Sequence, residues 1–387
     1  MDTRIRPVPA PTRPLEWGLA ALGTGALLAA VLAAPHDARA AAAQDWPPFV
    51  LVAGLLLVGL VADEDGLFAA GGSALARLSP NGLALYVGSV VLVVSVTTLL
   101  NLDTSVTFLT PVLVYAARSR GEGEAPLIYA CLLLSNAGSL MLPGSNLTNL
   151  IVLGHLHLSG GAFFAHMAPA ALAVAAVTAL VVGAVHHRDL RTTITPAGGH
   201  ERPVLGVGIV AVAAVTVLVV GLHSPAIPVA AVGIAAVVIR SWRHDSTTSP
   251  GAAVRILGLP VLVGLFGLAV ALGTLGRTWS GPATLLSHLD AWGTAFTAAL
   301  TSVLVNNLPA ASLLAARQPP HPFELLVGLN IGPNMFVTGS LAWVLWLRSA
   351  RAAGGRPDVR RASLLGLASA PLAIAAAVGV LTLGGAH

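Results

Sequence analysis

Long apolar runs, separated by short polar segments, fill the chain from about residue 15 to residue 384. A helix that crosses the hydrocarbon core of a bilayer needs about 20 apolar residues. Runs that meet this requirement predict full spans at 15–34, 47–62, 125–156, 163–185, 203–221, 224–239, 255–273, 324–347 and 363–384. The pattern therefore predicts an all-α polytopic membrane protein with about nine full spans.

Two further apolar runs, 83–117 and 292–316, are interrupted near their middle by polar residues. We interpret each as a re-entrant hairpin that enters and leaves the membrane on the same face. The spans 125–156 and 324–347 are interrupted too, by Gly and Pro, which break helices. The sequence thus predicts two hairpins and two broken helices.

The arginines indicate how the chain is oriented. All 20 basic residues are Arg. With both hairpins re-entrant, the loops of one face hold seventeen of them, and the other face keeps only Arg39, Arg277 and Arg317. Because positive residues stay on the cytoplasmic side, we expect a cytoplasmic N-terminus, an external His387 and residence in the plasma membrane, the cytoplasmic membrane of a bacterium. The first hairpin then opens to the cytoplasm and the second to the outside.

The two halves repeat these elements in opposite orientation. Asn101 in the first hairpin corresponds to Asn306 in the second, and 135–145 matches 330–340. Such an inverted repeat is typical of secondary transporters. The expected organisation is a cytoplasmic tail at 1–14, a first half at 15–185, central cytoplasmic loops and linking helices at 186–254, and a second half at 255–387.

Composition supports a membrane protein and excludes other classes. Hydrophobic residues make up 56% of the chain and charged residues 9%, and the mean hydropathy is +0.84. The net charge of +4 is a small Arg excess, so we expect no nucleic-acid partner. One cysteine, Cys131, excludes an internal disulfide and any site built from several thiolates.

The paired breaks favour a binding site. A backbone that leaves the helix at membrane depth must find hydrogen-bond partners in protein, water or a ligand. One break alone is typical of an ordinary kink, but each of these two breaks follows a polar hairpin tip. The candidate substrate and ion ligands are Asn101, Asp103, Thr104, Asn136, Ser139, Gly144, Ser145, Asn146, Asn306, Asn307, Asn330, Gly332, Asn334, Thr338, Gly339 and Ser340.

Asp103 is the one acid, of 16, that the pattern places at membrane depth. A buried ionisable group is costly and is a functional candidate by default, so we expect Asp103 to bind and release the coupling proton. The alternative is that it caps the second hairpin helix by accepting from amides near Val106, and both roles can coexist. No Arg is predicted at membrane depth, which argues against a multiply charged anion.

Other chemistry finds little support. His155 and His157, like His186 and His187, fall at predicted span ends, where imidazoles suit the interface, so we expect no metal site. Gly144-Ser145 lacks the flanking glycine of a nucleophile elbow and has no membrane-depth histidine as base. We therefore expect no enzymatic activity, and no cofactor besides a proton or sodium as coupling ion.

Several motifs together carry a family resemblance. They are Asp63-Glu64-Asp65-Gly66-Leu67-Phe68, the hairpin from Asp103 to Pro111, Pro143-Gly144-Ser145-Asn146-Leu147-Thr148-Asn149, Val305-Asn306-Asn307-Leu308-Pro309, and Gly332-Pro333 with Gly339-Ser340-Leu341-Ala342. Over roughly 51–373 the chain resembles the ArsB-like arsenite permeases, which are grouped with NhaD-type antiporters and the citrate and divalent-anion transporters. This resemblance implies scaffold and transport parts, hairpins that meet near the midplane, and alternating access.

The chain also departs from that family. Asn136 and Asn330 stand where ArsB-like pumps carry aspartates, Asn334 replaces a lysine, and Leu102 replaces the asparagine beside Asp103. The centre is therefore neutral apart from one carboxyl. An uncharged, amide-rich site would fit a neutral solute such as arsenous acid.

These observations predict an inverted-repeat secondary transporter, a permease for a small inorganic solute, with ArsB-like efflux of arsenite or antimonite coupled to protons. The alternatives are a sodium-coupled symporter of an inorganic anion or dicarboxylate, with Asn101, Asn306 and Asn307 around the sodium, a cation/proton antiporter, or a membrane scaffold that transports nothing. The expected partners are the solute and the lipid bilayer. A homodimer and a separate energising ATPase subunit are further expectations.

Overall fold

The computed structural model describes residues 13–154, 156, 158–191, 206–222, 224–242 and 250–384. These residues form helices joined by short turns and contain no strand, which confirms the all-α fold. The predicted His155, His157 and His387 and most of the tail 1–14 lie outside them.

The described helices up to residue 191 include the first predicted hairpin and the first predicted broken helix. They are α1 (Arg13–Ala33), α2 (Pro35–Glu64), α3 (Leu67–Leu78), α4 (Gly82–Leu99), α5 (Leu102–Ser119), α6 (Ala125–Gly138), η1 (Pro143–Ser145), α7 (Leu147–Leu153), α8 (Gly160–Val185) and η2 (Asp189–Arg191). The first hairpin, α4 with α5, turns at Leu100 and Asn101. The first broken helix consists of α6, η1 and α7.

The rest of the described chain repeats this series after a linking region. Its helices are α9 (Val207–Gly221), α10 (Ala226–Ser241), α11 (Pro250–Leu257), α12 (Leu259–Thr278), α13 (Gly281–Ser287), α14 (Ala291–Val305), α15 (Asn307–Leu314), α16 (Pro322–Ile331), η3 (Gly332–Met335), α17 (Ala342–Ala352) and α18 (Val359–Gly384). The second hairpin, α14 with α15, turns at Asn306. The second broken helix consists of α16, η3 and α17.

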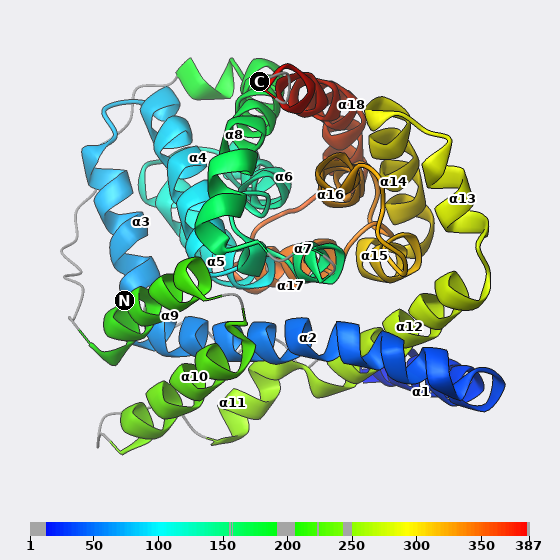
Figure 1. The fold of residues 1–387 in the computed structure, drawn as a ribbon. Helices are drawn as coiled ribbons and strands as arrows, with labels where there is room; N and C mark the ends of the chain where they lie inside the picture. The colour runs from blue at the N-terminus through cyan, green and yellow to red at the C-terminus, as the bar shows by residue number, and fades with distance from the viewer. Residues whose placement is uncertain are drawn as a thin grey trace.

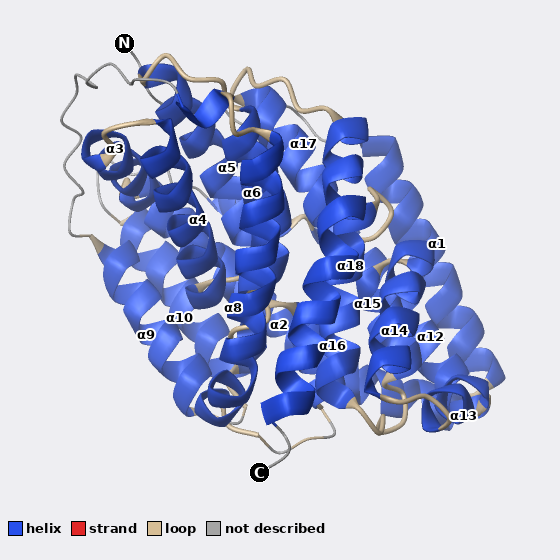
Figure 2. Ribbon diagram, turned by 90° about the horizontal axis from the view of Figure 1, so that it is seen from above, coloured by secondary structure: helices blue, strands red, loops and turns tan. Residues whose placement is uncertain are grey.

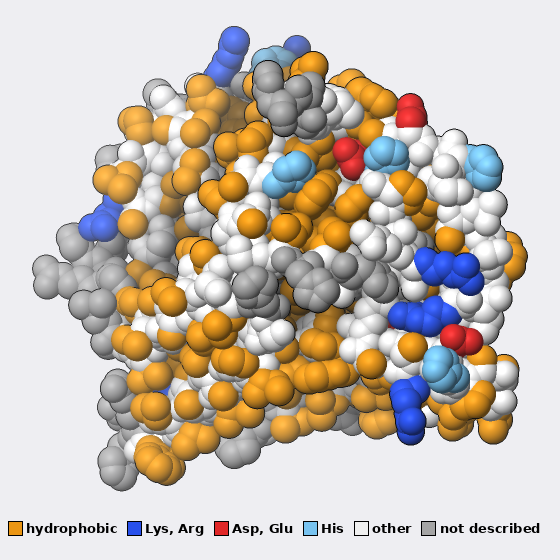
Figure 3. Space-filling view, viewed as in Figure 1, with side chains coloured by type: hydrophobic (Ala, Val, Ile, Leu, Met, Phe, Trp, Pro, Cys, Tyr) orange, Lys and Arg blue, Asp and Glu red, His pale blue; other side chains and the backbone are white. Residues whose placement is uncertain are grey.

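The surface and the helix lengths are those of a multi-pass membrane protein. Among the described residues, six segments are long and apolar enough to cross a bilayer. They are α1, α2, α4, α8, α18 and the stretch Gly251–Thr278 that contains α12. Large hydrophobic side chains are exposed around the outside, and Figure 3 shows them spread over one face with few charged groups among them. The total of about nine spans stays a prediction.

The helices form two layers (Figure 1). The α2 layer contains α1, α2, α9, α10, α11 and α12, and the hairpin layer contains all other helices. Small residues let the helices of the α2 layer approach closely: a Cβ on Gly23 of α1 would lie 2.0 Å from the Gly264 carbonyl oxygen of α12. Likewise, a Cβ on Gly54 of α2 would lie 2.7 Å from Ala230 of α10. Because lipid tails are as apolar as the helix surfaces, membrane helices associate through close van der Waals contacts of this kind.

Two short helices show the inverted arrangement of the repeats. α3 precedes the first hairpin and α13 precedes the second, and Figure 2 shows them at opposite ends of the bundle. The repeats also exchange contacts: α7 of the first half packs on α15 of the second, and α17 of the second half packs on α5 of the first.

The start of α2 differs from the prediction. The segment 35–46, expected to be a loop before the span 47–62, is helical, so α2 begins at Pro35. Proline suits the first helical position because its missing N–H has no helical partner there. As a result Asp45, expected outside the membrane-depth set, lies within a helix and is 1% exposed. Asp45, like Asp65 at 7%, is thus buried more deeply than the half-buried Asp103, and which acids lie at membrane depth stays a prediction.

Candidate functional site

Six polar side chains meet where the two broken helices face each other. We call Asn136, Ser139, Asn146, Asn149, Asn330 and Asn334 the asparagine network. The breaks place them there, because α6 ends at Gly138 and α16 at Ile331, and the chain leaves the helix just beyond. All six are buried, with Asn146 the most exposed at 6%.

The network joins the two halves directly. Asn136 Nδ2 donates to Asn334 Oδ1 over 2.7 Å. Asn146 Nδ2 donates to Asn330 Oδ1 over 2.5 Å, and Asn330 Nδ2 donates to Asn149 Oδ1 over 2.9 Å. Three amide pairs therefore connect the first half to the second.

The network also donates hydrogen bonds to backbone carbonyls at and before the first break. Asn149 Nδ2 donates to Ser139 O over 2.6 Å and to Leu142 O over 3.1 Å, and Asn334 Nδ2 donates to Leu133 O over 3.1 Å. Ser139 Oγ lies 3.1 Å from Asn330 Oδ1. Among the buried side-chain atoms of these six residues, only Asn136 Oδ1 has no partner in the described part of the chain. The network is thus largely self-satisfied, as buried polar groups must be.

The second hairpin tip is bonded to the break that follows it. Asn306 has φ +74°, a left-handed conformation that few side chains adopt, and its Nδ2 donates to Thr338 O over 3.2 Å. Asn307 N donates to Gly339 O over 2.8 Å, and Thr338 Oγ1 donates to Val303 O over 2.8 Å. These bonds fix the tip against its own broken helix.

The first hairpin tip keeps unpartnered polar groups. Asn101, 1% exposed, caps α5 by accepting from Thr104 N over 2.6 Å. Its Nδ2 has no partner among the described residues, and neither has the buried Thr104 Oγ1 or the buried Ser105 Oγ. Ser145 Oγ donates to Thr98 O over 2.9 Å, so this tip also touches its break. Unpaired buried groups are costly, and their gathering at one tip indicates a place for a polar ligand.

Asp103 lies next to that tip in the first turn of α5. Its side chain is half-buried and forms no hydrogen bond or ion pair with the described residues. The cap of α5 is Asn101, which shows that the alternative role considered for Asp103 belongs to its neighbour. A carboxylate near a helix N-terminus is favoured by the helix dipole, so Asp103 can carry a charge there or take up a proton.

The remaining predicted residues lie at the breaks and permit close packing. A Cβ on Gly332 would lie 2.6 Å from Ala299, and one on Gly339 would lie 2.5 Å from Pro333. A Cβ on Gly144 would lie 3.0 Å from the Val219 side chain. Ser340 is buried, and its hydroxyl has no hydrogen-bond partner among the described residues. Behind the second break, Trp343 Nε1 donates to Pro333 O over 2.8 Å.

Sequence reasoning missed several residues of this region. Asn149 lies within a quoted motif, three residues after Asn146, so helical spacing could have placed both on one face. Gln44 and Asp45 stand before Trp46 and two prolines, a pattern that favoured a loop. No local signal indicated that Arg277 contacts them.

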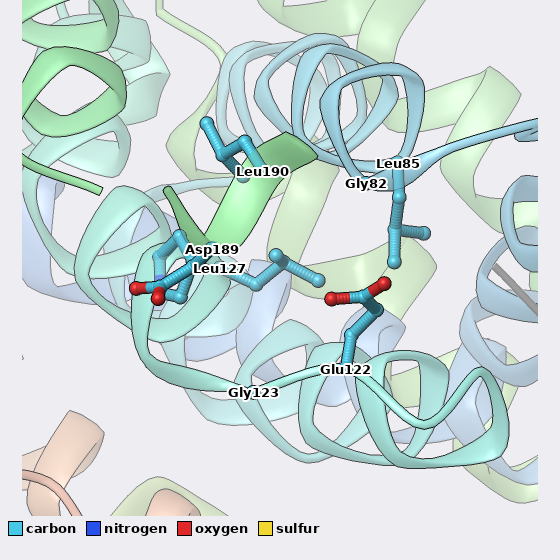
Figure 4. A pocket seen from close by; sticks show the side chains of 8 residues that line it. Gly82, Leu85, Glu122, Gly123, Leu127, Asp189 and Leu190 are labelled. Carbon is cyan, nitrogen blue, oxygen red and sulfur yellow. The ribbon is translucent and has the colours of Figure 1, made fainter. Parts of the chain in front are cut away.

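Two hollows lie away from the asparagine network. One, shown in Figure 4, is a space of about 10 Å³ between Glu122, Leu127 and Asp189, too small for more than a water molecule. The other is a groove of about 320 Å³ between α4 and α8, and its lining includes Thr98 and Met141.

Comparisons with known proteins add to this picture. Residues 12–345 match the family CitMHS, described as citrate transporter. The arsenical pump membrane protein of Escherichia coli is 25% identical over 336 residues, which are 78% of each chain. The crystal structure of the YdaH transporter of Alcanivorax borkumensis superposes with a TM-score of 0.54 and 15% identity, over 90% of this chain and 87% of that one. The fold is therefore that of a solved transporter.

Proposed function

Because the chain belongs to the CitMHS family, and so is a multi-pass secondary transporter of the ArsB and CitMHS superfamily, we propose that it exports arsenite or antimonite in exchange for protons. The solute would travel as its uncharged hydroxide. Asp103 would bind the proton, and the first hairpin tip with the asparagine network would bind the solute.

The observation that carries this proposal is that uncharged polar side chains at the first hairpin tip have hydrogen-bonding groups without a partner among the described residues. Asn101 Nδ2 offers a donor, and the hydroxyls of Thr104 and Ser105 can donate or accept. Arsenous acid has three hydroxyl groups, which can accept a hydrogen bond from the Asn101 amide and can donate to or accept from the two side-chain hydroxyls. Neither the tip nor the asparagine network contains an Arg, so these residues offer no fixed cation to a multiply charged anion such as citrate.

The likeness to an arsenical pump supports the same solute. The departures at Asn136, Asn330 and Asn334 remove charges from the centre, which favours a neutral species over an anion. In this proposal the N-terminus is cytoplasmic, the first hairpin opens to the cytoplasm, and Asp103 receives its proton from outside when the site turns outward.

Transport by the purified protein in proteoliposomes tests the proposal. With an imposed pH gradient, we expect saturable, gradient-dependent movement of arsenite and antimonite, and no uptake of citrate, sulfate or phosphate. Vesicles with a sodium gradient and no pH gradient should show no accumulation. Sodium-driven accumulation, or transport of citrate without arsenite, would contradict the proposal.

A further inference from the structure

The ends of two short helices from opposite repeats lie together against α2. α7 ends at Leu153 and α15 at Leu314, and the two helices are in contact beside α2 (Figure 1). The last carbonyls of a helix have no helical partner and carry partial negative charge. Two such ends at one place need a donor from elsewhere.

Gln44 of α2 supplies that donor to both ends. Its Nε2 donates to Ile151 O of α7 over 2.9 Å and to Ala315 O after α15 over 3.2 Å. Arg277 of α12 in turn donates to Gln44 Oε1, and its other nitrogen donates to Gly273 O over 2.9 Å. One glutamine side chain therefore links both repeats of the hairpin layer to the α2 layer.

Asp45, the next residue, is the charge opposite Arg277. The Asp45 side chain is buried near Arg277 and Ser312 of α15, and its Oδ2 has no hydrogen-bond partner among the described residues. A buried carboxylate needs a nearby cation, and a partly buried guanidinium needs an anion. Asp45 and Arg277 form no ion pair within 4.0 Å, but the negative charge of Asp45 favours the Arg277 guanidinium beside the Gln44 amide.

The opposite end of the molecule is fastened differently. Arg118 of α5 donates to Ala353 O over 3.2 Å and to Gly354 O over 2.6 Å, which satisfies the end of α17. Its other contact is Glu124 at 3.4 Å. Every residue of this Arg118 clamp belongs to the hairpin layer, so the clamp can stay closed when that layer moves as a body.

We propose that Gln44, Asp45 and Arg277 form a latch between the two layers, and that its opening is a required step of the access change. The inference rests on transport by alternating access and not on the identity of the solute. If the hairpin layer moves against the α2 layer, the bonds from Gln44 to Ile151 O and Ala315 O must break, and these two carbonyls then meet water. While closed, the latch stabilises one access state.

Thiol labelling tests the latch without any transport assay. A cysteine at Ala315, fully buried in this structure, reports opening in a Cys131→Ser background of the full-length protein in membranes. Gln44→Leu removes the amide donor at similar size, and Gln44→Glu keeps the contact with Arg277 while removing both donations. Each variant should raise the labelling rate of Ala315→Cys by about tenfold, because two hydrogen bonds of the closed state are lost.

Arg118→Leu is the matched control, since it removes a helix-end clamp inside one layer. It should leave the labelling rate at Ala315→Cys unchanged, and size-exclusion profiles show which variants are folded. Unchanged labelling in folded Gln44→Leu and Gln44→Glu overturns the latch, and so does a rate raised as much by Arg118→Leu. A latch that fails leaves proton-driven arsenite export intact, whereas failure of the export proposal leaves the labelling result standing.

Discussion

The two hairpin tips carry asparagine at corresponding positions but differ in their bonds. Asn306 at the second tip donates to Thr338 O, and its neighbour Asn307 donates through its backbone to Gly339 O. Asn101 at the first tip uses one amide atom as a helix cap and leaves Nδ2 without a partner among the described residues. Repeats that match in sequence can therefore differ in their bonding: one tip is bonded to its own broken helix, and the other keeps polar groups without a partner in the described chain.

The largest effect is expected from Asp103→Asn, because Asp103 gives the first tip a carboxyl group that the second tip, Asn306-Asn307-Leu308, lacks. The amide keeps the size of the side chain but cannot titrate, and α5 is capped by Asn101 in any case. We expect uphill arsenite export driven by a pH gradient to fall to background, with downhill exchange retained. Flux into proteoliposomes at several pH values measures this.

Asp290→Asn is the control for that substitution. Asp290 caps α14 of the other hairpin by accepting from Gly293 N over 2.7 Å, and its side chain is exposed. Export should be unchanged in this variant. If Asp103→Asn concentrates arsenite as well as the wild type and with the same pH profile, the carboxyl plays no part in coupling.

The next effect concerns the network that both halves share. Asn334→Leu removes the hydrogen bonds that Asn334 forms with Asn136 Nδ2 and Leu133 O, at a cost of about 1 to 3 kcal/mol for buried polar groups that lose a partner. We expect a lower unfolding temperature and less folded protein, rather than a selective change in solute affinity. Thermal unfolding in detergent measures the loss of stability, and KM of the folded variant measures the affinity for solute. Normal stability with a raised KM would instead place Asn334 in contact with the solute.

A smaller effect tests the asymmetry of the tips most directly. Asn101→Ser keeps a capping oxygen and removes the unpartnered Nδ2, so KM for arsenite should rise about fivefold, the equivalent of about 1 kcal/mol. Asn306→Gly, which suits the φ of +74°, should lower stability slightly and leave KM unchanged. Equal changes of KM at both tips would show that the ligand contacts both.

No effect on transport is expected from cysteines at Ser119 and Gln318, both exposed. In a Cys131→Ser background they should react with membrane-impermeant reagents from opposite faces, Ser119→Cys from the cytoplasm and Gln318→Cys from outside. This labelling tests the opposed hairpins on which the comparison of the tips depends. Reaction of both from one face would contradict the inverted topology.

The breaks could be predicted from sequence because they are local. Gly, Pro and polar residues interrupt the helices where the structure ends them, at Gly138 and Ile331 among others. The pairing across the breaks could not be predicted. When the two repeats are aligned, Ser139 corresponds to Asn334, but the residue that forms a hydrogen bond with Asn334 is Asn136. Contacts between the halves depend on how the helices cross, which the alignment does not show. The burial of Asp45 could not be predicted because it depends on the packing of distant helices around α2, which no pattern near Asp45 indicates.

The buried indole behind the second break gives the molecule an optical reporter of its own. Trp343 and Trp346 are fully buried, with ring centroids 6.0 Å apart, whereas the other tryptophans are at least 40% exposed. Since the Trp343 N–H is bonded to Pro333 O, any shift of the second break alters the surroundings of that ring. Intrinsic fluorescence should therefore change wavelength or intensity when solute or protons move the break, and Trp343→Phe should remove most of that signal. The unlabelled protein would then report its own working cycle in real time.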